Sequence, residues 1–223
     1  MIPRIIHYCW FGRGEKSDST KAYIETWRKT LPEYEIIEWN EDNFDVNSYT
    51  FTKEAYKFKN FAFVSDMCRL KALYEMGGIY LDTDVEVLRS FDEYLPHDSF
   101  CSYEGKWIGT AVMGTVPKAP WIKAFLDFYA NRHFLNWWGH PVRMPNTKIL
   151  TNFILPRLDK QEWPNTYPID FFCAKDWKSK QVVVTENTVA IHHYACTWAR
   201  KKKTTLDRIA LFFKGIKVRY MER

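Results

Sequence analysis

Two aspartates, one residue apart, follow a short apolar segment in the first half of the chain. The segment Gly77-Gly78-Ile79-Tyr80-Leu81 runs directly into Asp82-Thr83-Asp84. A strand that ends in a turn delivers such carboxylates to the carboxyl edge of a sheet, where α/β proteins bind their ligands. Carboxylate oxygens suit Mg²⁺ or Mn²⁺, which keep open positions for diphosphate oxygens. Asp-x-Asp is also common turn chemistry, so the buried strand and the glycine pair before it are what favour a site.

A second pair of charges lies on the helix predicted just before this strand. Residues 62–76 place Met67, Leu70 and Tyr74 at helical spacing, and the two glycines end the helix. Asp66 and Arg69 are three residues apart and share one face of it. An exposed ion pair of this kind contributes little to stability. Because the helix leads straight into the Asp82 strand, the pair is also a candidate part of the site.

The elements that must position these residues alternate along the chain. Strands alternating with helices predict an α/β fold with a mostly parallel sheet. Without an internal repeat or an early linker, we expect one domain over residues 1–199 and a basic amphipathic helix over residues 200–223. The sequence predicts strands at 2–10, 34–39, 79–81, 85–88, 99–103, 111–116, 181–184 and 189–192, and helices at 19–29, 62–76 and 121–131.

Composition excludes several classes of protein. The 223 residues are 46% apolar and 26% charged, which suits a globular chain with a full core rather than a disordered one. No apolar run approaches the roughly 20 residues of a membrane-spanning helix, and the opening residues predict a strand rather than a signal peptide. Five widely spaced cysteines without a CxxC pattern indicate reduced, buried thiols rather than disulfides or a zinc motif.

Positive charge is concentrated at the end of the chain. Residues 197–223 hold nine Lys or Arg against two acidic residues, whereas the preceding residues hold 23 against 25. A basic tail on a nearly neutral body argues against nucleic acid as the partner. Leu206, Ile209, Phe213 and Ile216 follow helical spacing with basic residues off that stripe, which predicts docking on an anionic membrane surface. A terminal helix packed on the body is the alternative.

Two strings of residues resemble a known family. The string FVSDMCRLKALYEMGGIYLDTDVE at residues 63–86, with IPRIIHYCWFG at residues 2–12, closely resembles glycosyltransferase family 32. That family includes bacterial capsular and lipopolysaccharide sugar transferases and fungal mannosyltransferases, and it is related to the glycosyltransferase domains of the large clostridial toxins. The resemblance implies a GT-A fold, that is, a single Rossmann-like nucleotide-sugar-binding domain. It also implies Mn²⁺ or Mg²⁺ as cofactor, and transfer with retention at the anomeric carbon.

The resemblance also implies roles for the acidic motif and the helix before it. Asp84 would bind the metal directly. Asp82 would contact the ribose or the donor sugar and reach the metal through water. Asp66 and Arg69 would hold the hydroxyls of the donor sugar.

Further roles implied by the resemblance lie near the two ends of the chain. Trp10 would border the nucleobase, with His7 and Tyr8 beside it. Near the C-terminus, either His192 or His193 would meet the metal, and the choice between them stays open. Trp198 would lie beside the leaving diphosphate.

Two segments depart from the family pattern. Thr110 and Pro145-Asn146 stand where family members often carry an Asn and a Gly-Pro, so the resemblance says least about the acceptor. The bacterial relatives suggest a UDP-sugar donor, a glycan or lipid-linked acceptor in surface polysaccharide synthesis, and a cytoplasmic enzyme held peripherally at the inner face of the cell membrane.

Two other functions fit parts of the sequence. A phosphatase of the haloacid-dehalogenase type also carries a strand followed by DxDx[TV], as in Asp82-Thr83-Asp84-Val85, but it needs a later aspartate pair that the chain does not supply. A non-catalytic sugar-binding, membrane-docked subunit could use the ten tryptophans for carbohydrate stacking. Slow hydrolysis of a nucleotide sugar with Mn²⁺ would distinguish a transferase from such a subunit.

Overall fold

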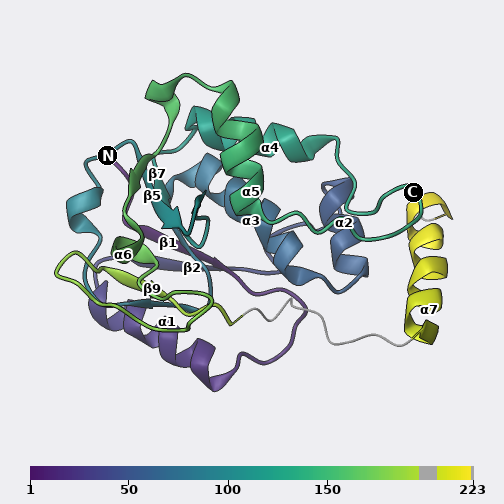
Figure 1. The fold of residues 1–223 in the computed structure, drawn as a ribbon, viewed down its shortest axis with the longest axis horizontal. Helices are drawn as coiled ribbons and strands as arrows, with labels where there is room; N and C mark the ends of the chain where they lie inside the picture. The colour runs from purple at the N-terminus through teal and green to yellow at the C-terminus, as the bar shows by residue number, and fades with distance from the viewer. Residues whose placement is uncertain (196–204, 222–223) are drawn as a thin grey trace.

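A mixed sheet forms the centre of the molecule. The computed structural model describes residues 1–195 and 205–221, whose main sheet has seven strands with helices on both faces (Figure 1). Five of these strands run in one direction and two, β6 and β7, run against them, so the predicted α/β fold with a mostly parallel sheet is confirmed. The spatial order is β2 (Glu35–Trp39), β1 (Ile5–Cys9), β3 (Gly78–Leu81), β7 (Val112–Thr115), β5 (Ser99–Glu104) and β6 (Trp107–Ile108), and β8 (Asn165–Tyr167) also pairs with β5.

A separate two-stranded ribbon joins distant parts of the chain. Strand β4 (Val85–Val87) directly follows Asp84 and pairs antiparallel with β9 (Ala190–His192), with Val85 opposite His192. Alternate residues of β4 are buried, which holds the ribbon against the body. The ribbon therefore returns a late part of the chain to the turn that follows β3.

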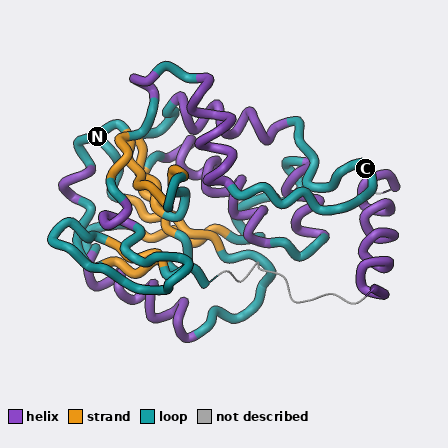
Figure 2. The backbone as a smooth tube through the Cα atoms, in the orientation of Figure 1, coloured by secondary structure: helices purple, strands orange, loops and turns teal. Residues whose placement is uncertain are grey.

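The helices form two layers around the sheet, whose strands appear orange in Figure 2. One apolar core lies between the sheet and α2 to α5, and a second lies between the sheet and α1 and α6. Tyr80 of β3 faces the first core while Ile79 and Leu81 face the second, as the period of a strand requires. The helices are α1 (Asp18–Thr30), α2 (Thr50–Lys57), α3 (Phe61–Met76), α4 (Pro120–Ala130), α5 (Asn146–Ile149), α6 (Ile169–Phe172) and α7 (Thr205–Ile216), with short 3₁₀ helices at Asp92–Tyr94, Leu155–Arg157 and Lys160–Glu162 and π-helical turns at Leu150–Ile154 and Lys217–Met221.

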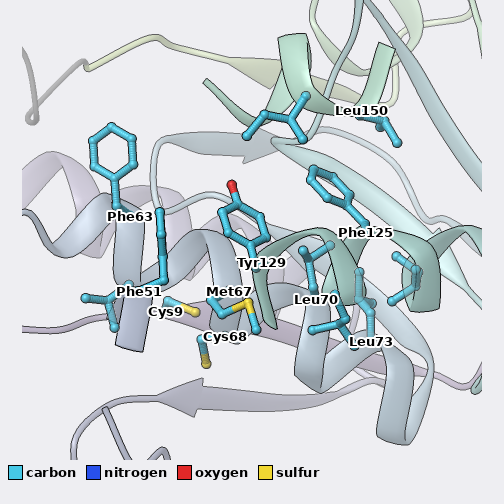
Figure 3. Packing of buried hydrophobic residues seen from close by; sticks show 14 of the residues in the cluster. Cys9, Phe51, Phe63, Met67, Cys68, Leu70, Leu73, Phe125, Tyr129 and Leu150 are labelled. Carbon is cyan, nitrogen blue, oxygen red and sulfur yellow. The ribbon is translucent and has the colours of Figure 1, made fainter. Parts of the chain in front are cut away.

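Helix α3 is the most enclosed of these helices. Met67, Leu70 and Leu73 have no measurable exposure, and they pack with Phe125 and Tyr129 of α4 in the first core (Figure 3). Two of its four charged residues, Asp66 and Arg69, are buried as well, whereas Lys71 and Glu75 reach solvent. The predicted helix over residues 62–76 is confirmed, and its surroundings account for its largely apolar sequence.

The short elements β6, β8, α5 and α6 were not predicted, and two further segments also differ from the sequence-based prediction. Helix α2 was not predicted; its Phe51 and Ala55 pack into the first core. The expected strand at residues 181–184 is wrong: this stretch is a loop in which Val183 is 63% exposed and Val184 57% exposed. β-branched residues favour strands only where neighbouring side chains pack against them. The side chains of Val183 and Val184 are mostly exposed and lack such neighbours.

The end of the chain packs against the body. The chain beyond α7 buries Val218 and Arg219, and Arg219 lies 3.5 Å from the carboxylate of Glu54 on α2. Figure 1 shows α7 beside the loop that follows α4. Within residues 1–195 and 205–221, no helix has the length and apolar character needed to cross a membrane. Residues 200–204 and 222–223 of the predicted basic segment lie outside the described residues.

Gly78 gives a direct test of how β3 is positioned. Its φ is +97°, and an added Cβ would lie 2.6 Å from the carbonyl oxygen of Ile5. We expect Gly78→Ala to lower the free energy of unfolding by about 2 kcal/mol or more, because steric crowding adds to backbone strain. Urea denaturation measures the change. Gly105→Ala is the matched control, since its φ is also positive at +61° but nothing lies within 4 Å of the added atom. Equal losses in both variants would contradict the close packing of β1 on β3.

Candidate active site

The acidic motif lies where β3 ends. The backbone N–H of Asp82 donates to the carbonyl of Ala111, and the N–H of Val85 donates back to the carbonyl of Asp82. This turn places Asp82 and Asp84 between the end of β3 and the start of β4. The structure therefore confirms the predicted strand at 79–81 and puts both carboxylates at the carboxyl edge of the parallel strands.

Arg69 links α3 to this turn. Its Nη2 atom lies 3.2 Å from Oδ1 of Asp66 and 3.1 Å from Oδ1 of Asp82. The arginine side chain is only 5% exposed and the Asp66 side chain 11% exposed, so the pair is not the surface ion pair that the sequence alone allowed. A buried charge without a partner is costly, and the two carboxylates and the guanidinium therefore depend on one another.

Two further contacts hold the arginine in place. Its Nη1 donates to the carbonyl of Thr110 at 2.7 Å. Its guanidinium lies 4.3 Å from the centre of the Tyr80 ring, and the Tyr80 hydroxyl donates to Asp82 at 2.9 Å. Because Thr110 contributes its backbone carbonyl, this contact does not depend on the residue that departs from the family pattern.

Burial shifts the titration of the aspartates. Burial raises the pKa of Asp66 to about 7, although Arg69 opposes the shift and Asp82 adds to it. Burial also raises the pKa of Asp82, against the opposing effects of Arg69 and His192. Burial acts in the same direction on Asp84, but hydrogen bonds from His192 and the Ala195 N–H outweigh it and lower the pKa of that carboxyl. Asp84 is thus the carboxylate most strongly held in its charged form.

Only one of the two candidate histidines faces the acidic motif. His192 Nε2 lies 3.4 Å from Oδ1 of Asp84, and the imidazole side chain is 10% exposed. His193 points the other way: its Nε2 lies 2.8 Å from Glu86 and its ring stacks on Tyr23 at 4.5 Å. The register of β4 against β9 explains the difference, since neighbouring residues at a strand end face opposite sides. The geometry therefore favours His192 over His193 as the histidine that would meet a metal beside Asp84.

The chemistry of this donor set fits a divalent cation. Asp82, Asp84 and His192 each offer one ligand atom, and these atoms lie within 4.8 Å of one another. Two carboxylates and an imidazole suit Mn²⁺ or Mg²⁺ better than a structural zinc ion, and they leave positions for other oxygen ligands. The excess of acidic groups over Arg69 and His192 also favours a bound positive charge.

The residues of the first strand divide between core and edge. His7 is fully buried, with its Nε2 donating to the carbonyl of Gly77 and its Nδ1 accepting from the Trp39 indole. Burial lowers its pKa to about 4, against the hydrogen bond to Gly77. Tyr8 is also buried and donates to Glu38.

Trp10 is better placed for a ligand. It follows β1 at the edge of the sheet where Asp82 follows β3, and its side chain is partly exposed. Its indole N–H donates to the carbonyl of Gly14, and Lys16 lies 5.5 Å from the ring centre. Of the three predicted residues, only Trp10 thus presents a ring at the site edge. The fourth predicted aromatic residue, Trp198, lies outside the described residues.

Sequence reasoning missed two residues that reach the site. Glu104 ends β5, and Cys173 follows α6. Each offers a ligand atom within 4.8 Å of a corresponding atom of His192. No motif marks either residue, because their proximity depends on how β5 and α6 pack around β9. The other described cysteines, Cys9, Cys68 and Cys101, are free and buried as predicted.

Four of the site residues fall within a region that matches a known protein family. Residues 17–101 match the family described as the glycosyltransferase sugar-binding region containing the DXD motif. The match includes Asp66, Arg69, Asp82 and Asp84. The resemblance to this kind of glycosyltransferase is therefore confirmed.

Known proteins share this sugar-binding region or its fold. Inositol phosphoceramide mannosyltransferase 2 of Schizosaccharomyces pombe is 26% identical over 172 residues, which are 74% of this chain and 49% of that protein. The chain thus spans about half the length of that relative. A glycosyltransferase involved in glycosylation of the major capsid of PBCV-1 has a TM-score of 0.50 at 11% identity, with 96% of this chain and 99% of the other covered.

A second solved structure shares the fold. The galactosyltransferase LgtC, solved with donor and acceptor sugar analogues, also has a TM-score of 0.50 at 11% identity, covering 94% of this chain and 95% of that one. At this level of identity the likeness concerns the fold. It confirms the predicted GT-A architecture around the sugar-binding region.

The Arg69 cluster makes a prediction about stability. Arg69→Met removes the cation shared by Asp66 and Asp82, and we expect it to lower the free energy of unfolding by about 3–5 kcal/mol. Asp66→Asn in the Arg69→Met background should recover part of that loss, because it removes one of the two stranded charges. Urea denaturation of the single and double variants provides the measurement. A double variant less stable than Arg69→Met would show that the carboxylates are not balanced by this arginine.

Proposed function

We propose that the chain is a glycosyltransferase that moves a hexose from a nucleotide sugar, with UDP-sugars favoured, to a glycan or lipid-linked acceptor. The observation that carries this proposal is the cluster of Asp82, Asp84 and His192 beside the buried Arg69–Asp66 pair, at the carboxyl edge of β3. Four of these five residues lie inside the matched sugar-binding region. The two solved glycosyltransferases support the fold in which such a site is built.

In this proposal Asp84, His192 and, through water, Asp82 hold Mn²⁺ or Mg²⁺. The cation supplies Lewis-acid stabilisation of the charge that grows on the leaving diphosphate. The chain contributes placement: Arg69 and Asp66 hold the hydroxyls of the donor sugar, and Trp10 borders the nucleobase. Because these groups are fixed by burial before the donor arrives, they stabilise developing charge without reorganising. Transfer with retention at the anomeric carbon completes the proposal.

Asp84 provides the test of this function. We expect Asp84→Asn to abolish most Mn²⁺-dependent hydrolysis of a UDP-sugar and to weaken Mn²⁺ binding. We expect little change in unfolding, because the partly exposed turn contributes little packing. Calorimetric titration of Mn²⁺ and release of UDP from a panel of UDP-sugars are the measurements. Asp92→Asn is the matched control, since Asp92 is an exposed carboxylate paired with Arg4 away from the site.

Two outcomes would contradict this function. Undiminished turnover in EDTA would remove the role of the cation. Release of sugar from none of the UDP-sugars, together with failure of UDP and GDP to raise the melting temperature, would remove the nucleotide-sugar donor.

We also propose that the acceptor is membrane-borne and that the chain docks peripherally on an anionic membrane surface, at the cytoplasmic face. The S. pombe relative is named for a lipid acceptor, which supports an acceptor of this type. The region around α7 offers exposed aromatic residues: Trp137 is 75% exposed, Trp138 69% and Phe213 66%. Tryptophan favours the membrane–water interface. Residues 128–158 contain no Asp or Glu, so the loop that carries both tryptophans brings no negative charge of its own.

The docking surface predicts a specific loss of vesicle binding. We expect Trp137→Ser with Trp138→Ser to weaken binding to phosphatidylglycerol-rich vesicles at least about tenfold, and removal of residues 200–223 to weaken it further. High salt should reduce binding of the unaltered chain, because basic residues near the surface each contribute about 1 kcal/mol. Co-sedimentation with vesicles measures binding. Trp177→Ser is the control, since Trp177 is 57% exposed in a different loop. Equal binding by the double variant and the control would overturn the docking surface.

A further inference from the structure

A second group of metal-binding residue types lies beside the acidic motif. Glu104, Cys173 and His192 each provide one ligand atom, and these atoms lie within 4.8 Å of one another. They come from three different elements: the end of β5, the residue after α6 and the end of β9. The two ring nitrogens of His192 face different partners: Nε2 lies 3.4 Å from Asp84, and Nδ1 lies 4.0 Å from Glu104.

The Nδ1 atom of His192 provides separate evidence for a ligand at this position. It is buried and makes no hydrogen bond of ordinary geometry to any of the described residues, although the Cys173 thiol lies close to the imidazole. The imidazole side chain is 10% exposed. A buried polar atom without a partner requires an explanation, such as a bound ion. The Tyr194 ring packs against the imidazole, with the two ring centres 4.1 Å apart. Glu104 and Cys173 are the neighbours of this imidazole that could bind a cation together with it.

We propose that Glu104, Cys173 and His192 Nδ1 form a site for a thiophilic divalent cation of the Zn²⁺ class. Thiolate, imidazole and carboxylate are the ligands that Zn²⁺ selects, with one position left open in a three-ligand site. Zinc bonds of about 2.0–2.3 Å place tetrahedral donors about 3.3–3.5 Å apart, so a contraction of about 1 Å completes the geometry. Binding releases to water the thiol proton of Cys173 and, from a charged imidazole, the proton on Nδ1. One imidazole proton is left on Nε2, where it is donated to Asp84.

His192 belongs to both groups of potential ligands, so a cation bound by Glu104 and Cys173 affects cation binding at the acidic motif. A neutral imidazole has one nitrogen with a free lone pair, and the other nitrogen carries the proton. A cation at Nδ1 therefore prevents Nε2 from binding the cation at Asp84. This consequence rests on the proposed function, whereas occupancy of the thiolate site does not. The Zn²⁺-class cation acts as an antagonist of Mn²⁺ at Asp84.

Cadmium is the probe for this site, because a thiolate bound to Cd²⁺ absorbs in the ultraviolet by charge transfer. The full chain, reduced with a phosphine, is titrated with Cd²⁺. We expect a band that saturates at one ion per chain and disappears in Cys173→Ser. Cys101→Ser is the matched control and should keep the band, because Cys101 is a buried cysteine on β5 with no place in the cluster. Glu104→Gln should keep the band but weaken Cd²⁺ binding by about tenfold or more.

The result that overturns the site is no thiolate band in the unaltered chain, or a band unchanged in Cys173→Ser. If Cys173→Ser does not fold, undiminished Cd²⁺ affinity in Glu104→Gln overturns it instead.

The Asp84→Asn variant separates the two sites. It should keep the Cd²⁺ band while losing Mn²⁺ binding, and loss of both would show a single shared site. Electron paramagnetic resonance of free Mn²⁺ tests the antagonism, since one equivalent of Cd²⁺ should release bound Mn²⁺ from the unaltered chain. If the chain transfers no sugar, the Cd²⁺ titration still decides this proposal.

Discussion

A guanidinium buried between two aspartates is the interaction on which the rest of the site depends. Arg69 is anchored in α3, while Asp82 belongs to the turn after β3, so their contact fixes the helix relative to the edge of the sheet. The same side chain donates to the carbonyl of Thr110, just before β7. One arginine thus joins a helix, a turn and the approach to a neighbouring strand. Its charge is retained in the interior because two carboxylates surround it.

The balance of charge around this arginine explains why the site favours positively charged ligands. Four carboxylates, on Asp66, Asp82, Asp84 and Glu104, are mostly buried near one arginine and one histidine. Burial raises the pKa of three of them by more than Arg69 and His192 lower it. A divalent ion would supply the missing charge. Among these four carboxylates, only that of Asp84 has a lowered pKa, because hydrogen bonds from His192 and the Ala195 N–H outweigh its burial.

The parts of this site that lie close together in the sequence were the parts that could be predicted from it. Asp66, Arg69, Asp82 and Asp84 lie on one helix and the strand after it, so local spacing was enough to group them. Burial of the Asp66–Arg69 pair was not predictable, because spacing on a helix does not tell which face is covered. The choice of His192 over His193 required the register of β4 against β9. Glu104 and Cys173 could not be identified from the sequence, because only tertiary packing brings them close to His192.

The elements of the fold also divide into those that could be predicted from the sequence and those that could not. The long helix α3 and the central strands were predicted because their apolar residues follow a clear period. Helix α2 was missed because it is short, and its buried Glu54 interrupts the apolar pattern. The valine run at residues 182–184 predicted a strand from its composition, although no neighbouring surface covers it.

The ribbon of β4 and β9 joins two parts of the site that are synthesised at different times: the carboxylates come first and His192 comes much later. Residues 1–115 contain strands β1 to β7 and the Arg69 cluster, and they leave the ribosome well before His192. A growing chain therefore has the acidic half of the site long before it has the imidazole. Proteolytic loss of the chain beyond β7 would recreate that earlier state, with the carboxylates present and their histidine missing. The three candidate ligands Asp82, Asp84 and His192 thus come together only when β9 pairs with β4.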